Sequence, residues 1–152
     1  LDLCEMSDFK GRVNMGPYST PEIVSELSKD ENCLYMTDAW VEDHGIQNPA
    51  IYDCFPKFLK FSLCRTGDTM PNTIRKMTGA VAERFSIKER GLIKAGYYAD
   101  LTVFDETKLR EDQLDQEKSF GIEKVYINGI KVLDGDVLDS EAIKHSGRAM
   151  RS

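Results

Sequence analysis

The sequence lacks an apolar run approaching the roughly 18 residues that a membrane-spanning helix requires. It also lacks the basic, apolar and small-residue regions of a secretory signal peptide. It has four cysteines and two histidines, and no two cysteines form a C-x-x-C pair, which argues against a zinc knuckle or a thioredoxin motif. We therefore expect no membrane span, and a reducing cytoplasm is the simplest compartment for these thiols.

Basic charge is also scarce. The 20 basic residues are outnumbered by 26 acidic ones, which gives a net charge of −6. Because binding to phosphates needs a basic face, this balance argues against a nucleic-acid partner. No basic amphipathic segment suggests a membrane surface either. The length of 152 residues fits one domain or part of a larger one.

The first half of the chain alternates between helix and strand patterns. The sequence Ser-Thr-Pro-Glu at 19–22 can cap a helix, and the apolar residues 33–37 predict a buried strand. With a further strand before that helix, this order is typical of a parallel sheet. Two more helices are predicted over 51–64 and 69–85. Gly79 lies inside the latter, where glycine costs about 1 kcal/mol, and a close helix contact would explain it.

The second half changes to a β pattern. Residues 99–104 predict a strand, and residues 122–133 predict a β-hairpin around Asn128-Gly129. Asn-Gly is a strong hairpin signal because a type I′ turn needs a positive φ at both central positions. The number of strands is too small to close a sandwich by itself.

Residues 74–105 carry a specific spaced pattern of lysine, threonine, alanine, glycine and aspartate. Its positions are Lys76, Thr78, Ala82, Ile87, Gly91, Ile93, Gly96, Ala99, Asp100, Leu101, Val103, Phe104 and Asp105. The pattern resembles the segment of the amidohydrolase superfamily in which the last barrel helix leads into a small β-domain. Residues 121–136 resemble the hairpin that follows in that superfamily.

Within the superfamily the sequence is most similar to the N-acyl-D-amino-acid deacylases, or D-aminoacylases. The matching phrases are Thr37-Asp38-Ala39, Phe55-Pro56, residues 75–79, residues 82–85 and residues 147–151. Ala39 replaces a glycine of that family, and residues 42–49 replace its histidine-rich loop. These two departures leave the substrate open.

The resemblance implies an α/β plus β architecture. Residues 1–87 would be the last strand–helix units of a metal-dependent TIM-like barrel, and residues 88–152 would be part of a small β-sandwich domain. The family takes its metal ligands, including an H-x-H pair, from earlier strands, and this sequence contains no H-x-H. The resemblance therefore implies the C-terminal third of an enzyme, with zinc in the full-length protein and none bound to this chain. The start at Leu1 rather than Met agrees with that expectation.

The resemblance assigns a catalytic role to Asp38, which would follow the eighth barrel strand at the end where barrel enzymes place catalytic groups. In the family this aspartate takes a proton from the metal-bound water and later delivers it to the leaving amine. A helix cap or an ordinary loop aspartate is the alternative. We read Asp100, by contrast, as a structural aspartate that binds backbone amides.

Three further residues are candidates for substrate binding: Met15, Trp40 and His44. Ordinary packing is an equal explanation for Met15, and solvation is the more common role for a lone loop histidine such as His44. The predicted substrate is a small N-acyl amino acid or a related amide, and self-association through exposed sheet edges is expected of the isolated chain.

Three functions fit these observations. The first is hydrolysis of a linear amide, as in deacylation of N-acyl-D-amino acids. The second is hydrolysis of a cyclic amide by a dihydroorotase-like or hydantoinase-like enzyme. The third is a non-catalytic assembly module that acts through its β-sheet. The phrases at 75–79 and 82–85 favour the first, and the chain alone is expected to be inactive.

Overall fold

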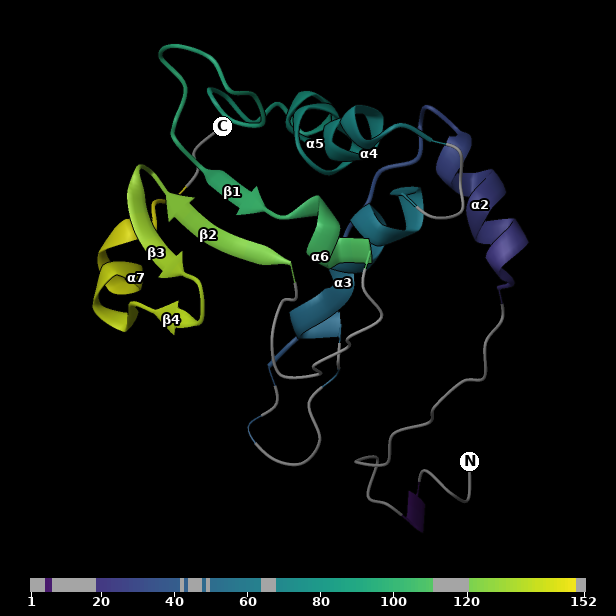
Figure 1. Ribbon diagram of the computed structural model, residues 1–152, viewed down its shortest axis with the longest axis horizontal. Coiled ribbons are helices and arrows are strands. Elements are labelled where there is room, and N and C mark those ends of the chain that lie inside the picture. Colours follow the sequence, from purple (N-terminus) through teal and green to yellow (C-terminus); the bar gives the residue numbers. More distant parts are fainter. Residues whose placement is uncertain are drawn as a thin grey trace.

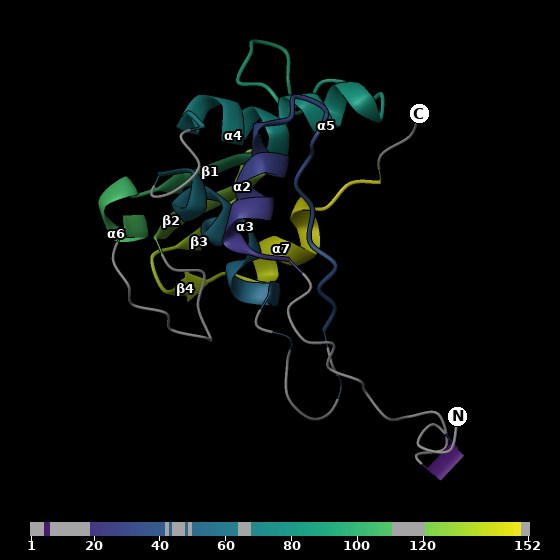
Figure 2. The ribbon, with the colours of Figure 1, turned by 90° about the vertical axis from the view of Figure 1, so that its right-hand side faces the viewer.

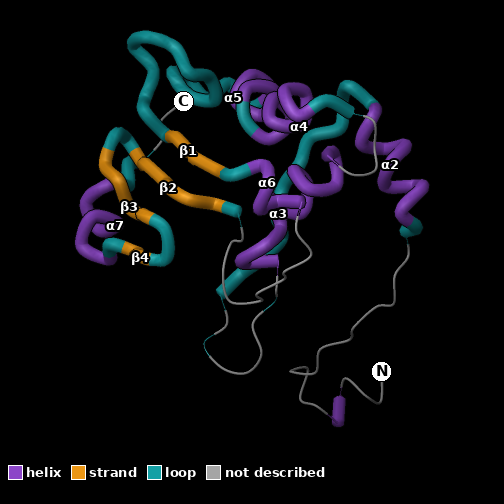
Figure 3. Tube along the Cα trace, in the orientation of Figure 1, coloured by secondary structure: helices purple, strands orange, loops and turns teal. Residues whose placement is uncertain are grey.

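The computed structural model describes residues 5–6, 19–41, 43, 48, 50–63, 68–110 and 121–149. Helices from the first half of the chain gather at one end of the molecule, and a four-stranded sheet from the second half lies at the other end (Figure 1). Colouring by secondary structure shows the strands β1 to β4 together, with α6 and α7 beside them (Figure 3).

The described residues of the first part include four helices with assigned bounds. They are α2 (Pro21–Lys29), α3 (Ala50–Phe61), α4 (Met70–Met77) and α5 (Gly79–Arg84). Thr20 caps α2, since its side chain accepts a hydrogen bond from the backbone N–H of Ile23, and Pro21 occupies the first turn. Thr69 caps α4 in the same way by accepting from the N–H of Asn72.

The helix predicted over 69–85 is in fact two helices, because the backbone breaks at Thr78. This residue has φ −131° and ψ −87°, and its hydroxyl donates to the carbonyl of Ile74 at 2.7 Å. The close approach expected at Gly79 exists, but its partner is a loop rather than a helix. A Cβ at position 79 would lie 3.2 Å from Leu92 Cδ2 and 3.3 Å from the carbonyl oxygen of Gly91.

The strand predicted over 33–37 does not form. Residues 33–41 contain neither helix nor strand. A buried parallel strand exists only when neighbouring strands supply the hydrogen bonds, and the described residues provide no such neighbour. What holds this stretch instead is a bond from the N–H of Tyr35 to the carbonyl of Lys76 at 3.3 Å. The strand expected before α2 lies outside the described residues.

The sheet is antiparallel throughout, in the order β1-β2-β3-β4. Its strands are β1 (Leu101–Phe104), β2 (Ile122–Ile127), β3 (Ile130–Asp134) and β4 (Val137–Leu138). The predicted hairpin is confirmed: Ile127 faces Ile130, and the turn residues Asn128 and Gly129 have φ values of 49° and 82°.

Two helices in this part were not predicted from the sequence: α6 (Glu106–Arg110) and α7 (Ser140–Ser146). Asp139 caps α7, because one of its carboxylate oxygens accepts from the N–H groups of Glu141 and Ala142. Helix α7 packs against β3 (Figure 2). The sheet and α7 both lie within residues 88–152, the range in which the β-domain is predicted.

The described part of the chain has a small core and wide exposed apolar faces. Its buried hydrophobic residues are Leu59, Ala80, Ala82, Leu109 and Val132. The apolar face of α2 is largely exposed, with Ile23 49% and Leu27 58% accessible, and so are Met36 and Trp40. The predicted core stripe of the third helix is only half-buried, and its last member, Phe85, is 69% exposed. Surfaces of this kind are typical of sites that contact other polypeptide.

Two glycines with similar positive φ allow a test of how closely the loop after α5 packs against that helix. Gly91 has φ +81°, and a Cβ there would lie 2.7 Å from Ala82 Cβ, whereas Gly96 has φ +86° and open space. We expect Gly96→Ala to cost about 1–2 kcal/mol from backbone strain alone. Gly91→Ala should cost ~1–3 kcal/mol more from overpacking.

Urea denaturation of both variants measures this difference. If both variants lowered the free energy of unfolding by the same amount, the close packing of Gly91 on α5 would be contradicted.

Candidate functional site

The predicted catalytic aspartate lies on an extended connection that we call the Asp38 arm, residues 33–41. Asp38 and Trp40 are both exposed, with Trp40 52% accessible. The arm turns at this point, because the N–H of Ala39 donates to the hydroxyl oxygen of Thr37 at 3.1 Å. The structure thus carries Asp38 and Trp40 on one short arm, whereas the other two candidates, Met15 and His44, lie outside the described residues.

Helices α3 and α4 hold the arm in place through its residues 35 and 36. The N–H of Tyr35 donates to the carbonyl of Lys76 in α4. The Tyr35 ring packs on Phe58 of α3 with 4.5 Å between ring centroids. The thiol of Cys54 in α3 lies 3.7 Å from the carbonyl oxygen of Met36. These contacts take the place of the missing strand ladder.

A buried charge lies behind the arm. Lys76 is wholly buried, and its ammonium group donates to the carbonyl of Ser28 in the last turn of α2. The same nitrogen lies 3.5 Å from a carboxylate oxygen of Asp68. Burial of a charge is costly unless it is paired and hydrogen-bonded, and here both conditions are met.

The ionised form of Asp68 is favoured by its surroundings. Partial burial by itself raises the pKa of this carboxyl group. Hydrogen bonds from the Asn72 side chain and the Thr69 N–H, together with the charge of Lys76, outweigh that effect, and the pKa lies below its ordinary value of 3.8. Burial also raises the pKa of Tyr35, and its hydrogen bond with the Ser28 side chain opposes this rise in part.

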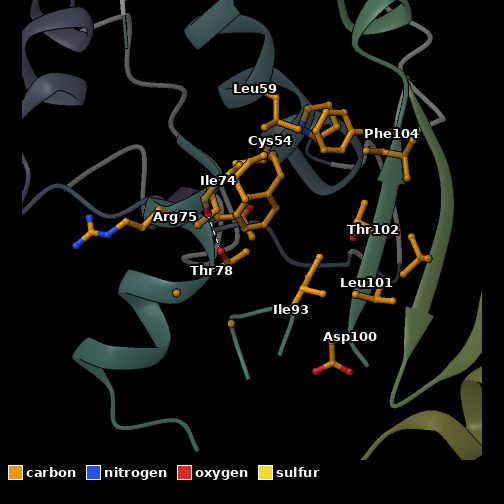
Figure 4. Close-up of a pocket in the computed structure, with 18 of the residues that line it drawn as sticks. Cys54, Leu59, Ile74, Arg75, Thr78, Ile93, Asp100, Leu101, Thr102 and Phe104 are labelled. Atoms are coloured by element: carbon orange, nitrogen blue, oxygen red, sulfur yellow. Dashed lines mark hydrogen bonds between the residues drawn. The ribbon is translucent and has the colours of Figure 1, made fainter. Parts of the chain in front are cut away.

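A cavity of about 790 Å³ separates the helices from the sheet. Residues of α3 and α4 form one wall and residues of β1 to β3 form the other, as Figure 4 shows for Leu59 and Ile74 opposite Leu101 and Phe104. The lining is mainly apolar. Thr37 of the arm borders this space but Asp38 does not, so the carboxylate and the cavity are separate features.

Asp100 has the structural role that its sequence predicts. One of its carboxylate oxygens accepts from the backbone N–H of Asn128 at 2.8 Å, and the other pairs with Arg90. Arg90 also donates to the side-chain oxygen of Asn128 and lies over the Tyr98 ring. The aspartate of this motif therefore ties the start of β1 to the hairpin turn.

The described residues do not fit a metal ion by themselves. No group of three or more histidine, cysteine, aspartate or glutamate side chains lies close enough within them to hold one. No helix among the same residues is long and apolar enough to cross a membrane.

Sequence reasoning missed Lys76, which it treated only as one position of a motif. The available signal is a second helical face: Thr73, Lys76 and Ala80 are spaced by three and four residues, and all three are buried. A lysine on such a face indicates a buried ion pair, but the sequence does not identify its partner.

Replacing Asp68 by Asn tests the buried pair through its pH dependence. The folded-state pKa lies below the unfolded value, so the stabilisation is complete above the unfolded value and is lost as pH falls through the folded one. We expect Asp68→Asn to lower the free energy of unfolding by ~1 kcal/mol at pH 7. Below about pH 4 the difference in this free energy between variant and wild type should shrink.

Urea titrations at pH 7, 5 and 3 measure that difference. A difference of the same size at pH 3 and pH 7 would show that the Asp68 charge contributes nothing.

The sequence of this chain is similar to those of two known deacylases. No protein-family model matches the chain. A D-aminoacylase of Alcaligenes xylosoxydans xylosoxydans is 32% identical over 107 residues, which are 68% of this chain and 22% of that protein. An N-acyl-D-aspartate deacylase of the same organism is 36% identical over 76 residues, 48% of this chain and 15% of that protein.

A solved structure agrees with these sequence matches. A crystal structure of D-aminoacylase, described as defining a novel subset of amidohydrolases, superposes with a TM-score of 0.60 at 30% identity and covers 70% of this chain. A further D-aminoacylase structure with the same overlap concerns a binuclear metal centre. The chain spans about a fifth of the length of these relatives, 22% and 23% for the two D-aminoacylases. The chain is therefore related to D-aminoacylase and is similar to the C-terminal part of that amidohydrolase, as its sequence motifs predict.

Proposed function

We propose that this chain belongs to a metal-dependent hydrolase that deacylates N-acyl-D-amino acids, and that Asp38 is its proton-transferring carboxylate. The observation that carries the proposal is the similarity to D-aminoacylase, at 32% identity in sequence and a TM-score of 0.60 in structure. The two sequence relatives are a D-aminoacylase and an N-acyl-D-aspartate deacylase, so the substrate class is a small linear amide.

The chemistry assigned to Asp38 follows from what amide hydrolysis requires. Water adds to the acyl carbon, the C–N bond breaks, and the amine nitrogen must gain a proton before it leaves. A carboxylate within hydrogen-bond reach can accept the water's proton and deliver it to that nitrogen. Asp38 is exposed on an arm that two helices hold, which leaves its oxygens accessible to a substrate. Trp40, two residues further on, would contact the substrate.

The metal of such an enzyme would be held by residues other than those described. A related D-aminoacylase has a binuclear metal centre, and a bound metal ion supplies Lewis-acid activation in hydrolases of this kind. Zinc is our proposal for the metal. Because the described residues contain no suitable group of ligands, we assign no metal-binding role to this chain.

We also propose the domain division that the motifs imply. Residues 1–87 would complete a (β/α)8 barrel, and residues 88–152 would contribute to a β-sandwich. The sheet β1–β4 supports the second part, since it is antiparallel and α7 packs against β3. The exposed apolar residues of α2 and of the Asp38 arm support the first part, since a barrel would cover them.

An assembly module is a second candidate, which one observation favours. Strand β1 pairs only with β2 among the described strands, so its other edge is open for pairing. In this alternative the sheet would bind another chain, and Asp38 would have no role in catalysis.

Asp38→Asn in the full-length native protein separates the two candidates. We expect the turnover of an N-acyl-D-amino acid to fall by about two orders of magnitude or more, because proton transfer by a positioned side chain contributes ~10²–10⁴-fold. Folding, followed by circular dichroism, should be unchanged. Asp43→Asn, an exposed aspartate nearby, is the matched control.

Unchanged turnover in Asp38→Asn would reject the catalytic assignment. It would favour the assembly module.

The purified 152-residue chain should not hydrolyse N-acyl-D-amino acids by itself. It spans about a fifth of its relatives, and the metal-dependent part of the reaction would lie elsewhere. Chelator-sensitive release of free amino acid by this chain alone would refute the expectation.

The same preparation should self-associate through the β1 edge and its exposed apolar faces. Light scattering measures this association. A monodisperse monomer that unfolds cooperatively would contradict it.

A further inference from the structure

Lys76 connects three segments that are far apart in the sequence. Its ammonium group donates to the carbonyl of Ser28 at the end of α2 and lies 3.5 Å from Asp68, just before α4. Its own backbone carbonyl accepts a hydrogen bond from the N–H of Tyr35 in the Asp38 arm. One wholly buried residue therefore contacts both α2 and the arm that follows it.

The connection between those two contacts is short and tightly turned. The N–H of Cys33 donates to the carbonyl of Asp30, and the N–H of Asn32 donates to the Asp30 side chain. Because Lys76 holds this connection at Ser28 on one side and at Tyr35 on the other, movement of either end disturbs the path of the arm.

The arm has other contacts besides this one, among them a hydrogen bond between the Tyr35 and Ser28 side chains, which also joins it to the end of α2. No strand ladder supports it in the described structure, and the contact between the Cys54 thiol and Met36 is weak, at 3.7 Å. The Tyr35 ring packs on Phe58 with an interplanar angle of 38°, which restrains the ring. The hydrogen bond from the Tyr35 N–H to the Lys76 carbonyl joins the backbone of the arm directly to α4.

We propose that Lys76 is a positioning residue for Asp38: its buried ammonium group fixes α2 against α4, and its carbonyl thereby fixes the arm three residues before the carboxylate. This inference rests on the proposed function for its effect on catalysis. Its structural content, the dependence of the arm on Lys76, does not. Lys76 is wholly buried and would not contact the substrate, so a displaced arm should reduce turnover rather than binding.

The test uses the full-length native protein with Lys76→Met, which keeps an unbranched side chain one heavy atom shorter and removes its charge. Asp68→Asn is the second variant, since it weakens the same pair from its partially exposed side. Lys144→Met, an exposed lysine of α7, is the matched control. Hydrogen exchange measured by mass spectrometry follows residues 33–41 and the hairpin 122–134, and kinetics with an N-acyl-D-amino acid give kcat and KM.

We expect Lys76→Met to accelerate exchange in residues 33–41 while the hairpin keeps its wild-type rate, with a smaller change of the same kind in Asp68→Asn. The kcat should fall about tenfold or more, with KM within about twofold. Exchange that rises equally in the arm and the hairpin, or in neither, overturns the proposal.

The two hypotheses fail in different ways. If the wild-type protein does not hydrolyse the substrate, or Asp38→Asn leaves turnover unchanged, the proposed function fails while the exchange rates still decide the structural role of Lys76. If Asp38→Asn abolishes turnover but Lys76→Met changes neither exchange nor kcat, the positioning role alone fails.

Discussion

A lysine removed from water determines how the helical half of this molecule is arranged. An ammonium group without solvent must find acceptors, and Lys76 finds them at Ser28 in α2 and at Asp68 before α4. Its backbone then holds the Asp38 arm through Tyr35. Among the described residues of this half the buried hydrophobic ones are Leu59, Ala80 and Ala82, so the polar cluster adds a specific contact between α2, α4 and the arm.

The exposed apolar faces of this chain can be understood from the greater length of its relatives. Ile23 and Leu27 on α2, and Met36 and Trp40 on the arm, would be expensive to leave in water over a large contiguous area. The D-aminoacylases that resemble this chain are between four and five times as long as the matched segment. Additional polypeptide packed on these faces would account for both observations, and it would also provide neighbours for residues 33–37.

Features that depend on local chemistry could be predicted from the sequence. The Asn128-Gly129 turn and the hairpin around it follow from backbone preferences of two adjacent residues. The structural role of Asp100 was predicted from its place in a spaced motif, and the structure confirms its bond to a backbone amide. The family itself was recognised from the same motifs.

Features that depend on distant partners could not be predicted. The apolar run 33–37 has the composition of a buried strand, but a strand requires neighbours, and the described residues supply none. The helix breaks at Thr78, next to the close approach of Gly79 to residues 91–92, and no local pattern reveals either feature. Lys76 was overlooked because a charged residue is usually exposed, and only its partners in α2 and before α4 make its burial acceptable.

The most direct test of the account is a crystal structure of the full-length native protein with metal and a bound D-amino acid product. The account predicts that a carboxylate oxygen of Asp38 lies about 2.6–3.2 Å from the amine nitrogen of that product. An Asp38 side chain that faces bulk solvent or caps a helix, away from the bound product, would contradict it.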